Sequence, residues 1–281
     1  YDYFNVSLQN ASGTVLASQD TGKDISFDTG VDSAGDYYVV IQDDYYYSAD
    51  DYSFSTTIGA AAANNTAETE SNNTLSTADT IEMGKAITGQ LFSRSDLDYF
   101  KFDVTQASTL QLVFDAPTNS TVYDYFSISV QDSSGTILSS HEVGSDHTFS
   151  TALNSAGTYY VKVEDGYYYN GGQYSLTGSL TNGTSNRETE GNNLRSTADV
   201  ISSGSSITGQ ISSRSDFDYY KISTDGAATI TIDFDAPTNS SVYDYFNVSL
   251  QNASGTVLAS QDTGKDISFD TGVDSAGDYY V

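Results

Sequence analysis

The chain has 281 residues and carries 38 Asp and Glu against 10 Lys and Arg, which gives a formal net charge of −28 at pH 7. Such an acidic chain is not expected to bind nucleic acid as its main task, because phosphate contacts need clustered Lys and Arg. The chain has no Cys, which excludes disulfides, thiolate zinc sites and a Cys nucleophile, and the sequence has no apolar run long enough for a membrane span.

Aromatic residues indicate a β protein. The chain has 23 Tyr and 13 Phe, and many of them alternate with polar residues, a pattern typical of strands and not of disordered chains. No stretch of about 12 residues shows the i, i+3, i+4, i+7 spacing of an amphipathic helix. We therefore expect an all-β fold.

Repeats organise the chain from its first residue. Residues 1–39 recur without change at residues 243–281, and a diverged copy of the same stretch begins at Tyr123. Residues 68–102 match residues 188–222 in the same way. The copies follow one another with a period of about 120 residues, which is the size of a whole domain rather than of a solenoid turn.

Two polar segments without aromatic residues divide the repeats into domains, because small polar residues cannot build a core. They predict linkers at residues 59–67 and 181–187, with one complete domain at residues 68–180 between them. Residues 1–58 would be the C-terminal part of one domain, and residues 188–281 the N-terminal part of another. We expect both to be folded as sandwich strands that match the central domain. The array would continue either in one longer chain or by strand exchange between neighbouring chains.

Alternation of apolar and polar residues with a period of two predicts the strands. It occurs in residues 108–117 and 228–237, while residues 123–138 predict a hairpin and residues 34–44 and 156–165 predict further strands that follow a Gly. The expected inward-facing residues are Leu110, Leu112, Phe114, Phe126, Ile128, Val130, Ile230, Ile232 and Phe234. Several short strands per period, separated by turn residues, indicate a β-sandwich.

Acidic residues at alternate positions form a candidate metal site. In an extended segment alternate side chains share a face, and the two segments concerned have the same spacing in both repeats. The residues are Glu68, Glu70, Asn72, Asp96 and Asp98, and their counterparts Glu188, Glu190, Asn192, Asp216 and Asp218. Ca²⁺ takes six to eight oxygen ligands of these types, and clustered carboxylates without a cation would repel each other. The alternative is a solvated acidic linker beside an exposed strand.

Two runs of tyrosine are candidates for ligand binding. One comprises Tyr45, Tyr46 and Tyr47, and the other Tyr167, Tyr168 and Tyr169. If each run lay on a strand, its central ring would face away from its two neighbours, so at least one ring per run would be exposed. Exposed aromatic rings suit the binding of glycans, collagen-like chains or a neighbouring subunit. The alternative is a structural role in which a loop packs the rings flat.

Signatures of an enzyme are missing from the sequence. His141 and His147 occur in the middle copy only, because Gln19 and Ile25 stand at their places in the first copy. A catalytic His is not expected to lack its counterpart in a sister repeat, so we expect packing or solvated roles. The sequence has no G-x-S-x-G, no H-E-x-x-H and no phosphate-binding loop.

Six short motifs in a fixed order connect the period to a known family. They are E-x-E-x-N-N, S-T-A-D, I-T-G-Q, D-x-D-Y-[FY]-K-[FI], A-G-x-Y-Y-V and Q-Y-S-L. In this order the chain resembles the bacterial pre-peptidase C-terminal domain, which is similar to the collagen-binding domains of clostridial collagenases. The resemblance implies secreted, tandem, jelly-roll-like β-sandwich domains that often bind calcium and are not catalytic. It places calcium ligands at the acidic positions given above, together with the carbonyl groups of Tyr99 and Tyr219.

The expected function follows from the repeats and the acidic clusters together. We expect an extracellular, calcium-stabilised tandem-repeat protein with a structural or adhesive role at the cell surface or in a filament, whose main partners are further copies of the repeat. The alternative is an accessory module of a secreted hydrolase, which would hold collagen or a polysaccharide through its tyrosines. Neither role is that of an enzyme.

Overall fold

The computed structural model describes residues 3–31, 34–47, 51–59, 66–120, 122–184, 186–237 and 242–281. The chain divides into two compact units, Tyr1–Thr184 and Ser185–Val281. Within the described residues the regular elements are strands, apart from one turn of 3₁₀ helix, Arg195–Thr197. The expected all-β fold of tandem β-sandwich domains is confirmed.

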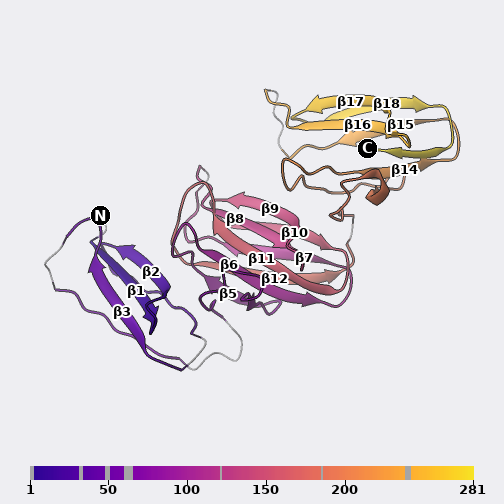
Figure 1. Cartoon of the computed structure of the whole chain (residues 1–281). Coiled ribbons are helices and arrows are strands. Elements are labelled where there is room, and N and C mark those ends of the chain that lie inside the picture. Colours follow the sequence, from indigo (N-terminus) through magenta and orange to yellow (C-terminus); the bar gives the residue numbers. More distant parts are fainter. Residues whose placement is uncertain are drawn as a thin grey trace. The chain divides into compact units, whose positions relative to one another are not determined.

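The central domain consists of two sheets (Figure 1). The first has the order β4 (Asp79–Thr80), β6 (Leu97–Val104), β11 (Gly157–Asp165), β8 (Phe126–Gln131) and β9 (Ile137–Val143). The second has the order β10 (His147–Leu153), β7 (Ser108–Asp115), β12 (Tyr174–Asn182) and β5 (Ala86–Gly89). Pairing is antiparallel except between β4 and β6. Strand β12 therefore lies between β7 and β5.

The core fills the space between these sheets. Every second residue of β7 and β8 is fully buried, as the alternation predicts, and these residues are Leu110, Leu112, Phe114, Phe126, Ile128 and Val130. Three rings from three strands meet at the centre of the core, and we call them the aromatic trio: Phe114, Phe126 and Tyr174. Their centroids are 5.1, 5.3 and 5.8 Å apart. Contacts of this kind add to the stabilisation from burial alone.

The predicted hairpin of residues 123–138 is present, and its turn is built by one side chain. Asp132 Oδ1 accepts hydrogen bonds from the amides of Ser134 at 2.8 Å and Thr136 at 3.0 Å. Gly135 takes a φ of 84°, which a residue without a Cβ adopts at little cost. The strands β8 and β9 therefore meet in a fixed register.

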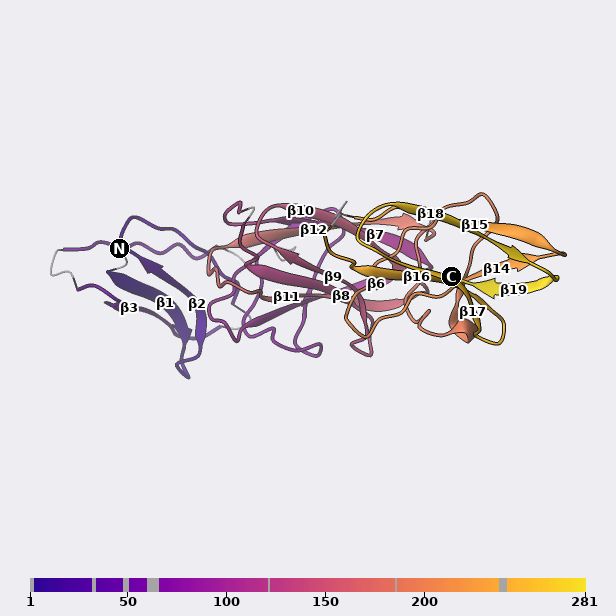
Figure 2. The same cartoon turned by 90° about the horizontal axis from the view of Figure 1, so that it is seen from above.

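The C-terminal module, Ser185–Val281, repeats most of this arrangement (Figure 2). One sheet has the order β13 (Asp199–Val200), β14 (Tyr220–Thr224), β19 (Gly277–Tyr280), β16 (Phe246–Asn252) and β17 (Val257–Thr263). The other sheet pairs β15 (Ala228–Phe234) with β18 (Ile267–Val273). Its described residues include no counterpart of β12, and residues 206–209, which align with β5, form no strand.

The N-terminal segment forms one three-stranded sheet. Its order is β2 (Val15–Thr21), β1 (Phe4–Asn10) and β3 (Tyr37–Asp43), which corresponds to β9, β8 and β11 of the central domain. The register shift of the β8–β9 pair recurs between β1 and β2. This part of residues 1–58 folds like the matching sandwich strands.

Two other parts of residues 1–58 correct the expectation for this segment. Residues 25–31 are identical to β18, yet they form no strand, and residues 52–58, which align with β12, form none either. The physical reason is the missing neighbour, because β18 pairs with β15 and β12 with β7, and residues 1–58 contain no counterpart of β7. The prediction that the whole segment is folded as sandwich strands is wrong for these two stretches.

The predicted domain boundaries remain predictions in detail. Residues 60–65 of the linker at 59–67 lie outside the described residues. The two compact units meet at Thr184 and Ser185, inside the predicted linker at 181–187, although β12 extends two residues into it.

Candidate metal site

An extended segment that precedes β4 carries the first acidic residues. The amide of Glu68 donates to the carbonyl of Thr88 in β5 at 2.8 Å, and the amide of Thr88 donates to the carbonyl of Thr66 at 2.9 Å. The amide of Thr69 donates to Asp79 Oδ2 at 2.7 Å. These bonds hold the segment against the edge of the sandwich, where alternate side chains point inward.

Three carboxylates meet at this edge. Glu68 and Glu70 come from the extended segment and Asp98 from β6, and their oxygens lie within 4.8 Å of one another. All three side chains are buried, and Asp98 is 0% exposed. None of the ion pairs in the described part of the chain involves them. Burial of three acids without a cationic side chain is costly unless another cation or protons neutralise them.

Hydrogen bonds satisfy only part of this cluster. Glu68 Oε1 accepts from the amide of Gln90, and Asp98 Oδ2 accepts from the hydroxyl of Tyr174, both at 2.5 Å. Both carboxylate oxygens of Glu70 and the amide oxygen of Asn72 are buried and accept no hydrogen bond from the protein. Buried oxygens without donors are rare in folded proteins, and a bound cation would satisfy these.

Burial and mutual repulsion shift the titration of the cluster. Burial, followed by the charges of Asp96 and Asp98, raises the pKa of Glu70 to about 9. Burial likewise raises the pKa of Asp96 to about 6. For Glu68 and Asp98 the pKa is also raised well above the ordinary value, mainly by burial. The protein surroundings therefore disfavour the ionised cluster as long as no cation is bound.

The remaining predicted ligands lie at the border of this cluster. Asp96 is buried, but its oxygens accept from the amides of Phe92 at 2.9 Å and Leu97 at 3.1 Å, so it also shapes the turn before β6. Tyr99 contributes its amide, which donates to the carbonyl of Asn72 at 3.2 Å.

The carbonyl group of Tyr219 takes part in the pairing of two strands, β13 and β14. That carbonyl accepts from the amide of Asp199 at 2.9 Å. A carbonyl oxygen that accepts one hydrogen bond keeps a second lone pair, so the ligand roles expected for the carbonyl groups of Tyr99 and Tyr219 stay predictions.

The second cluster has the same layout but a more open setting. Glu188, Asn192 and Asp216 are buried, whereas Glu190 and Asp218 are half-buried. Burial and neighbouring carboxylates raise the pKa of Glu190 to about 8 and that of Asp218 to about 9. The structure thus brings both predicted sets of acidic residues together.

A tyrosine hydroxyl reaches each cluster from a different strand. In the central domain it belongs to Tyr174 of β12, whereas in the C-terminal module Tyr220 of β14 donates to Glu188 Oε2 at 2.7 Å. Gly89 and Gly209, at matching positions, leave room for these hydroxyl groups. A Cβ on Gly89 would overlap the hydroxyl of Tyr174, and a Cβ on Gly209 would overlap that of Tyr220. The central domain has Phe100 where the C-terminal module has Tyr220.

Sequence reasoning missed two parts of the site. Asp79 and Asp199 orient the extended segments, because each accepts the amide of the residue that follows the first Glu, at 2.7 Å in both repeats. The S-T-A-D motif, present in both copies, could have signalled this role. Tyr174 lies 76 positions from Asp98, and no local pattern could have connected the two.

Hard cations fit the donor set. Each cluster offers several carboxylates and one amide oxygen, which are the ligand types of Ca²⁺. The buried oxygens of Glu70 and Asn72 that lack donors are the observation that favours this fit. In the central domain Glu68, Glu70, Asn72 and Asp98 would hold the ion, with Asp96 at the border.

The tyrosine runs lie in loops and not on strands, which corrects the geometry expected for them. Tyr167 is 78% exposed and Tyr168 is 40% exposed, while Tyr45 and Tyr47 are 81% and 78% exposed. Tyr46, 41% exposed, stacks edge-on against Tyr45 at 4.8 Å. Exposed rings are therefore present in both runs, as predicted, although strand alternation is not the reason.

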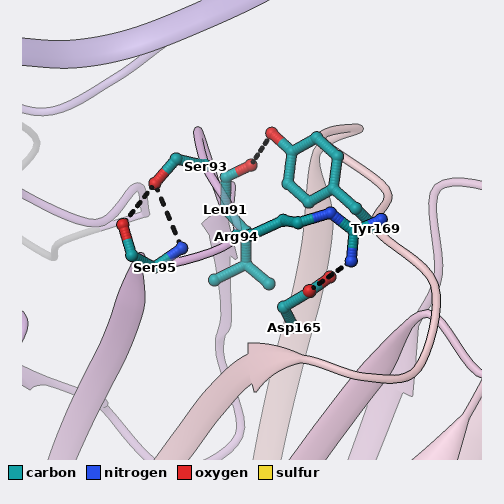
Figure 3. Close-up of polar contacts among 6 residues, drawn as sticks. All are labelled: Leu91, Ser93, Arg94, Ser95, Asp165 and Tyr169. Atoms are coloured by element: carbon teal, nitrogen blue, oxygen red, sulfur yellow. Dashed lines mark hydrogen bonds and ion pairs between the residues drawn. The ribbon is translucent and has the colours of Figure 1, made fainter.

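Tyr169 has a structural role (Figure 3). Its hydroxyl donates to the carbonyl of Leu91 at 2.9 Å, and the guanidinium of Arg94 lies over its ring at 5.6 Å from the centroid. Arg94 also forms an ion pair with Asp165 at 2.9 Å. These contacts attach the loop after β11 to the turn before β6. Its counterpart Tyr47 has neither partner within residues 1–58 and is exposed.

The two histidines pack against each other and against Phe149. His147 Nε2 and His141 Nδ1 are 3.3 Å apart, and the ring of His141 lies 4.0 Å from that of Phe149. Burial, followed by the charge of His147, lowers the pKa of His141 to about 4. This packing agrees with the role expected for residues that only the middle copy has.

Residues 96–165 match the family model of the bacterial pre-peptidase C-terminal domain. The predicted resemblance is therefore confirmed for this part of the chain. A search of curated proteins found no match. No helix of the described residues has the length and apolar character that a membrane crossing requires.

Solved structures that are similar to the chain include a domain of a collagenase, a pair of modules of a glycoside hydrolase and a peptidase. The pre-peptidase C-terminal domain of a collagenase from Bacillus anthracis has 18% identity and a TM-score of 0.31, covering 36% of this chain and 94% of that one. Tandem CBM51 modules of a family 98 glycoside hydrolase from Streptococcus pneumoniae have 8% identity and a TM-score of 0.25, and the match covers 70% of this chain and 78% of that one. Tripeptidyl peptidase 2 has 12% identity and a TM-score of 0.27, and the match covers 72% of this chain and 22% of that one.

Proposed function

From the family match of residues 96–165, we propose that the chain is part of an extracellular, calcium-stabilised tandem-repeat protein with a structural or adhesive role. Its partners would be further copies of the repeat. Near-identical copies in tandem, without enzyme motifs, support a mechanical role. The high negative charge would keep the repeats soluble and apart.

The observation that carries this proposal is the acidic cluster, which is buried in the central domain and recurs in a more open setting in the C-terminal module. Three carboxylates lie within 4.8 Å in the central domain, and buried oxygens of Glu70 and Asn72 have no hydrogen-bond donor. A solvated acidic linker would expose these groups to water instead. Binding of Ca²⁺ to the folded state alone would stabilise it, by about 2.7 kcal/mol at a hundredfold excess over the Kd.

The position of the cluster suggests how the ion would stiffen an array. Its ligands come from the extended segment at the domain's start and from β6, so the ion would clamp that segment to the sandwich. The same segment contacts the N-terminal repeat, because the amide of Gly30 donates to the carbonyl of Glu68 at 2.9 Å. Calcium would thus stabilise a junction that no disulfide can stabilise, because the chain has no Cys.

Chelation tests this proposal. In excess EGTA the melting temperature should fall relative to that in millimolar Ca²⁺, and elemental analysis of the purified chain should find calcium. An unchanged melt together with the absence of bound metal would refute a calcium-stabilised fold.

The exposed tyrosines favour a second candidate, an accessory module that binds collagen or a polysaccharide. Tyr167 and Tyr168 stack at 4.8 Å, and Tyr168 also packs on Tyr123 at 4.6 Å, which gives an exposed aromatic patch. Such patches suit glycans and extended chains. Binding to collagen or polysaccharide beads that Tyr167→Ala abolishes, without a change in the melting temperature, would favour this function over a purely structural one.

A further inference from the structure

Two histidines face each other between the sheets of the central domain. His141 lies on β9, the last strand of the first sheet, and His147 lies on β10, the last strand of the second (Figure 1). In the strand pairing His141 is opposite Ile128 and His147 is opposite Phe114, and both of these partners are fully buried. Since directly opposite residues point to the same face of a sheet, both imidazole rings point inward, at the side of the sandwich that β9 and β10 border.

The turn between these two strands does not account for the histidines. Asp146 donates its amide to Asn119 Oδ1 at 2.8 Å, and its Oδ1 accepts from the amide of Ala116 at 3.0 Å. The C-terminal module forms the second of these bonds as well, between Ala236 and Asp266 at 3.0 Å, and it has no histidine. The turn therefore holds the two strands in place, whichever residues stand at the histidine positions.

The sister repeats have other residues at both positions. Gln19 and Ile25 stand there in the first copy, and Gln261 and Ile267 in the third. Ile267 packs against the core of the C-terminal module, so His147 replaces an apolar side chain. An imidazole at such a position loses apolar packing and takes polar nitrogens out of water. A ligand that both rings share would offset this cost.

The spacing of the two rings fits one tetrahedral ion. His141 Nδ1 and His147 Nε2 are 3.3 Å apart, and the ring centroids are 5.0 Å apart. Two imidazole nitrogens at about 2.0–2.1 Å from a Zn²⁺ ion and at the tetrahedral angle are about 3.3–3.4 Å apart, with ring centroids about 5.2 Å apart. A square-planar site, typical of Cu²⁺, would bring neighbouring nitrogens to about 2.9 Å. The spacing therefore favours zinc.

We propose that His141 Nδ1 and His147 Nε2 bind one Zn²⁺ ion between the two sheets of the central domain. Burial, followed by the charge of His147, lowers the pKa of His141 to about 4, so its ring is neutral at pH 7 and has a lone pair for a metal. Both rings are half-buried, so an ion can reach them. Among the described residues the sets of three or more His, Cys, Asp and Glu ligands do not include these histidines, so water would complete the coordination shell.

Zinc would connect the two sheets where hydrogen bonds do not. Within the described residues β9 pairs with β8 alone, and β10 pairs with β7 alone. An ion held by one ring from each strand would add a link between these two edges. Because the link exists in the folded state only, zinc should stabilise the central domain by mass action. The sister repeats lack this link, since both lack the histidines.

Nuclear magnetic resonance of the ¹⁵N-labelled full chain tests the binding atoms. The chain has two His, so the single variants assign all four ring nitrogens. Zinc added in saturating Ca²⁺ should shift the Nδ1 signal of His141 and the Nε2 signal of His147, and should leave a proton on the other nitrogen of each ring. A shift at one ring only, or no shift, would overturn the proposal and leave a hydrogen bond between two neutral rings.

Calorimetry tests the stoichiometry and the ligands. The account predicts one zinc ion per chain in saturating Ca²⁺, bound at least tenfold more weakly by His141→Gln and by His147→Ile, because each variant keeps one of two imidazole ligands. Both variants carry the residues of the sister repeats, so the fold should tolerate them, and their zinc-free melting temperatures check this. Glu142→Gln, at an exposed neighbour of His141, should bind zinc like the unmodified chain. Zinc binding that persists unchanged when both histidines are replaced would overturn the proposal.

This inference goes beyond the proposed function and uses none of its acidic residues. Saturating Ca²⁺ keeps zinc out of the acidic clusters, because their oxygen ligands suit the harder ion. A chain that combines Glu70→Gln with Glu190→Gln should therefore bind zinc as the unmodified chain does, whether or not calcium stabilises the fold. Loss of zinc binding in that chain would assign the zinc to the acidic clusters and overturn the proposal.

Discussion

The two acidic clusters have the same residues at the same spacing, yet the central one is closed and the C-terminal one is open. Asp98 is fully buried, whereas the aligned Asp218 is half-buried. The difference lies outside the motif, since β12 covers the central cluster and has no counterpart among the described residues of the C-terminal module. The motif therefore supplies the ligands, and a strand distant in sequence decides how far they are removed from water.

The tyrosine hydroxyl groups show how the open cluster differs chemically. Tyr174 donates to Asp98 in the central domain, while Tyr220 donates to Glu188 in the C-terminal module. The hydroxyl thus reaches a different carboxylate in each cluster. A cation would contact a similar set of oxygens in both clusters. Without a cation, the desolvation penalty on the carboxylates is larger in the central cluster than in the C-terminal one.

The largest contrast between the clusters is expected from Glu70→Gln and Glu190→Gln. Glu70→Gln should stabilise the calcium-free central domain at pH 7 by about 1–3 kcal/mol, because the pKa of Glu70 is about 9 in the fold and its carboxylate must take up a proton on folding, which Gln does not need. In excess Ca²⁺ the same substitution should destabilise it, because a ligand is lost. The effect of Glu190→Gln should be smaller in both conditions, since Glu190 is half-buried.

Urea denaturation with and without EGTA measures both the expected stabilisation in the absence of calcium and the expected destabilisation in its presence. Glu142→Gln is the matched control, because Glu142 is exposed and lies outside the cluster. If Glu70→Gln destabilised the domain equally in EGTA and in Ca²⁺, the cluster would be a structural hydrogen-bond site and not a cation site.

Dependence on pH should be the next largest effect. The folded-state pKa of Glu70 is about 9, above the ordinary value of 4.5, so the calcium-free fold binds more protons than the unfolded chain between these values. Its stability should therefore fall as pH rises through this range. In excess Ca²⁺ protons compete with the ion, so the advantage of calcium over EGTA should grow with pH. Melting curves from pH 5 to 9 check this, and an advantage that shrinks with pH would contradict it.

Removal of the tyrosine hydroxyl should have the smallest effect. Tyr174→Phe deletes a fully buried hydrogen bond to Asp98, whose pKa burial raises well above its ordinary value, so the lost bond is one to a neutral carboxyl group and should cost about 0.5–1.5 kcal/mol. Tyr220→Phe should cost less, because Tyr220 is half-buried, whereas Tyr174 is 1% exposed. The exposed Tyr167→Phe serves as a control in the same urea titrations. Equal costs at Tyr174 and Tyr220 would mean that enclosure by β12 does not distinguish the clusters.

The sequence predicted the sandwich, its alternating core and the convergence of both acidic sets, because each rests on local spacing or on the repeat. It could not predict that identical stretches adopt different structures. Residues 25–31 and β18 have the same seven residues, but only β18 has a strand, β15, to pair with. Nor could local spacing show that Tyr174 belongs to the acidic site, because β12 reaches it through tertiary packing.

Isothermal titration of Ca²⁺ into the metal-free full chain tests the central claim most directly. The account predicts two bound ions per chain, one lost in Glu70→Gln and both lost when Glu70→Gln and Glu190→Gln are combined. Elemental analysis after dialysis should give the same counts. No binding at millimolar Ca²⁺, or binding that the double variant leaves unchanged, would contradict the assignment of the buried acidic clusters as calcium sites.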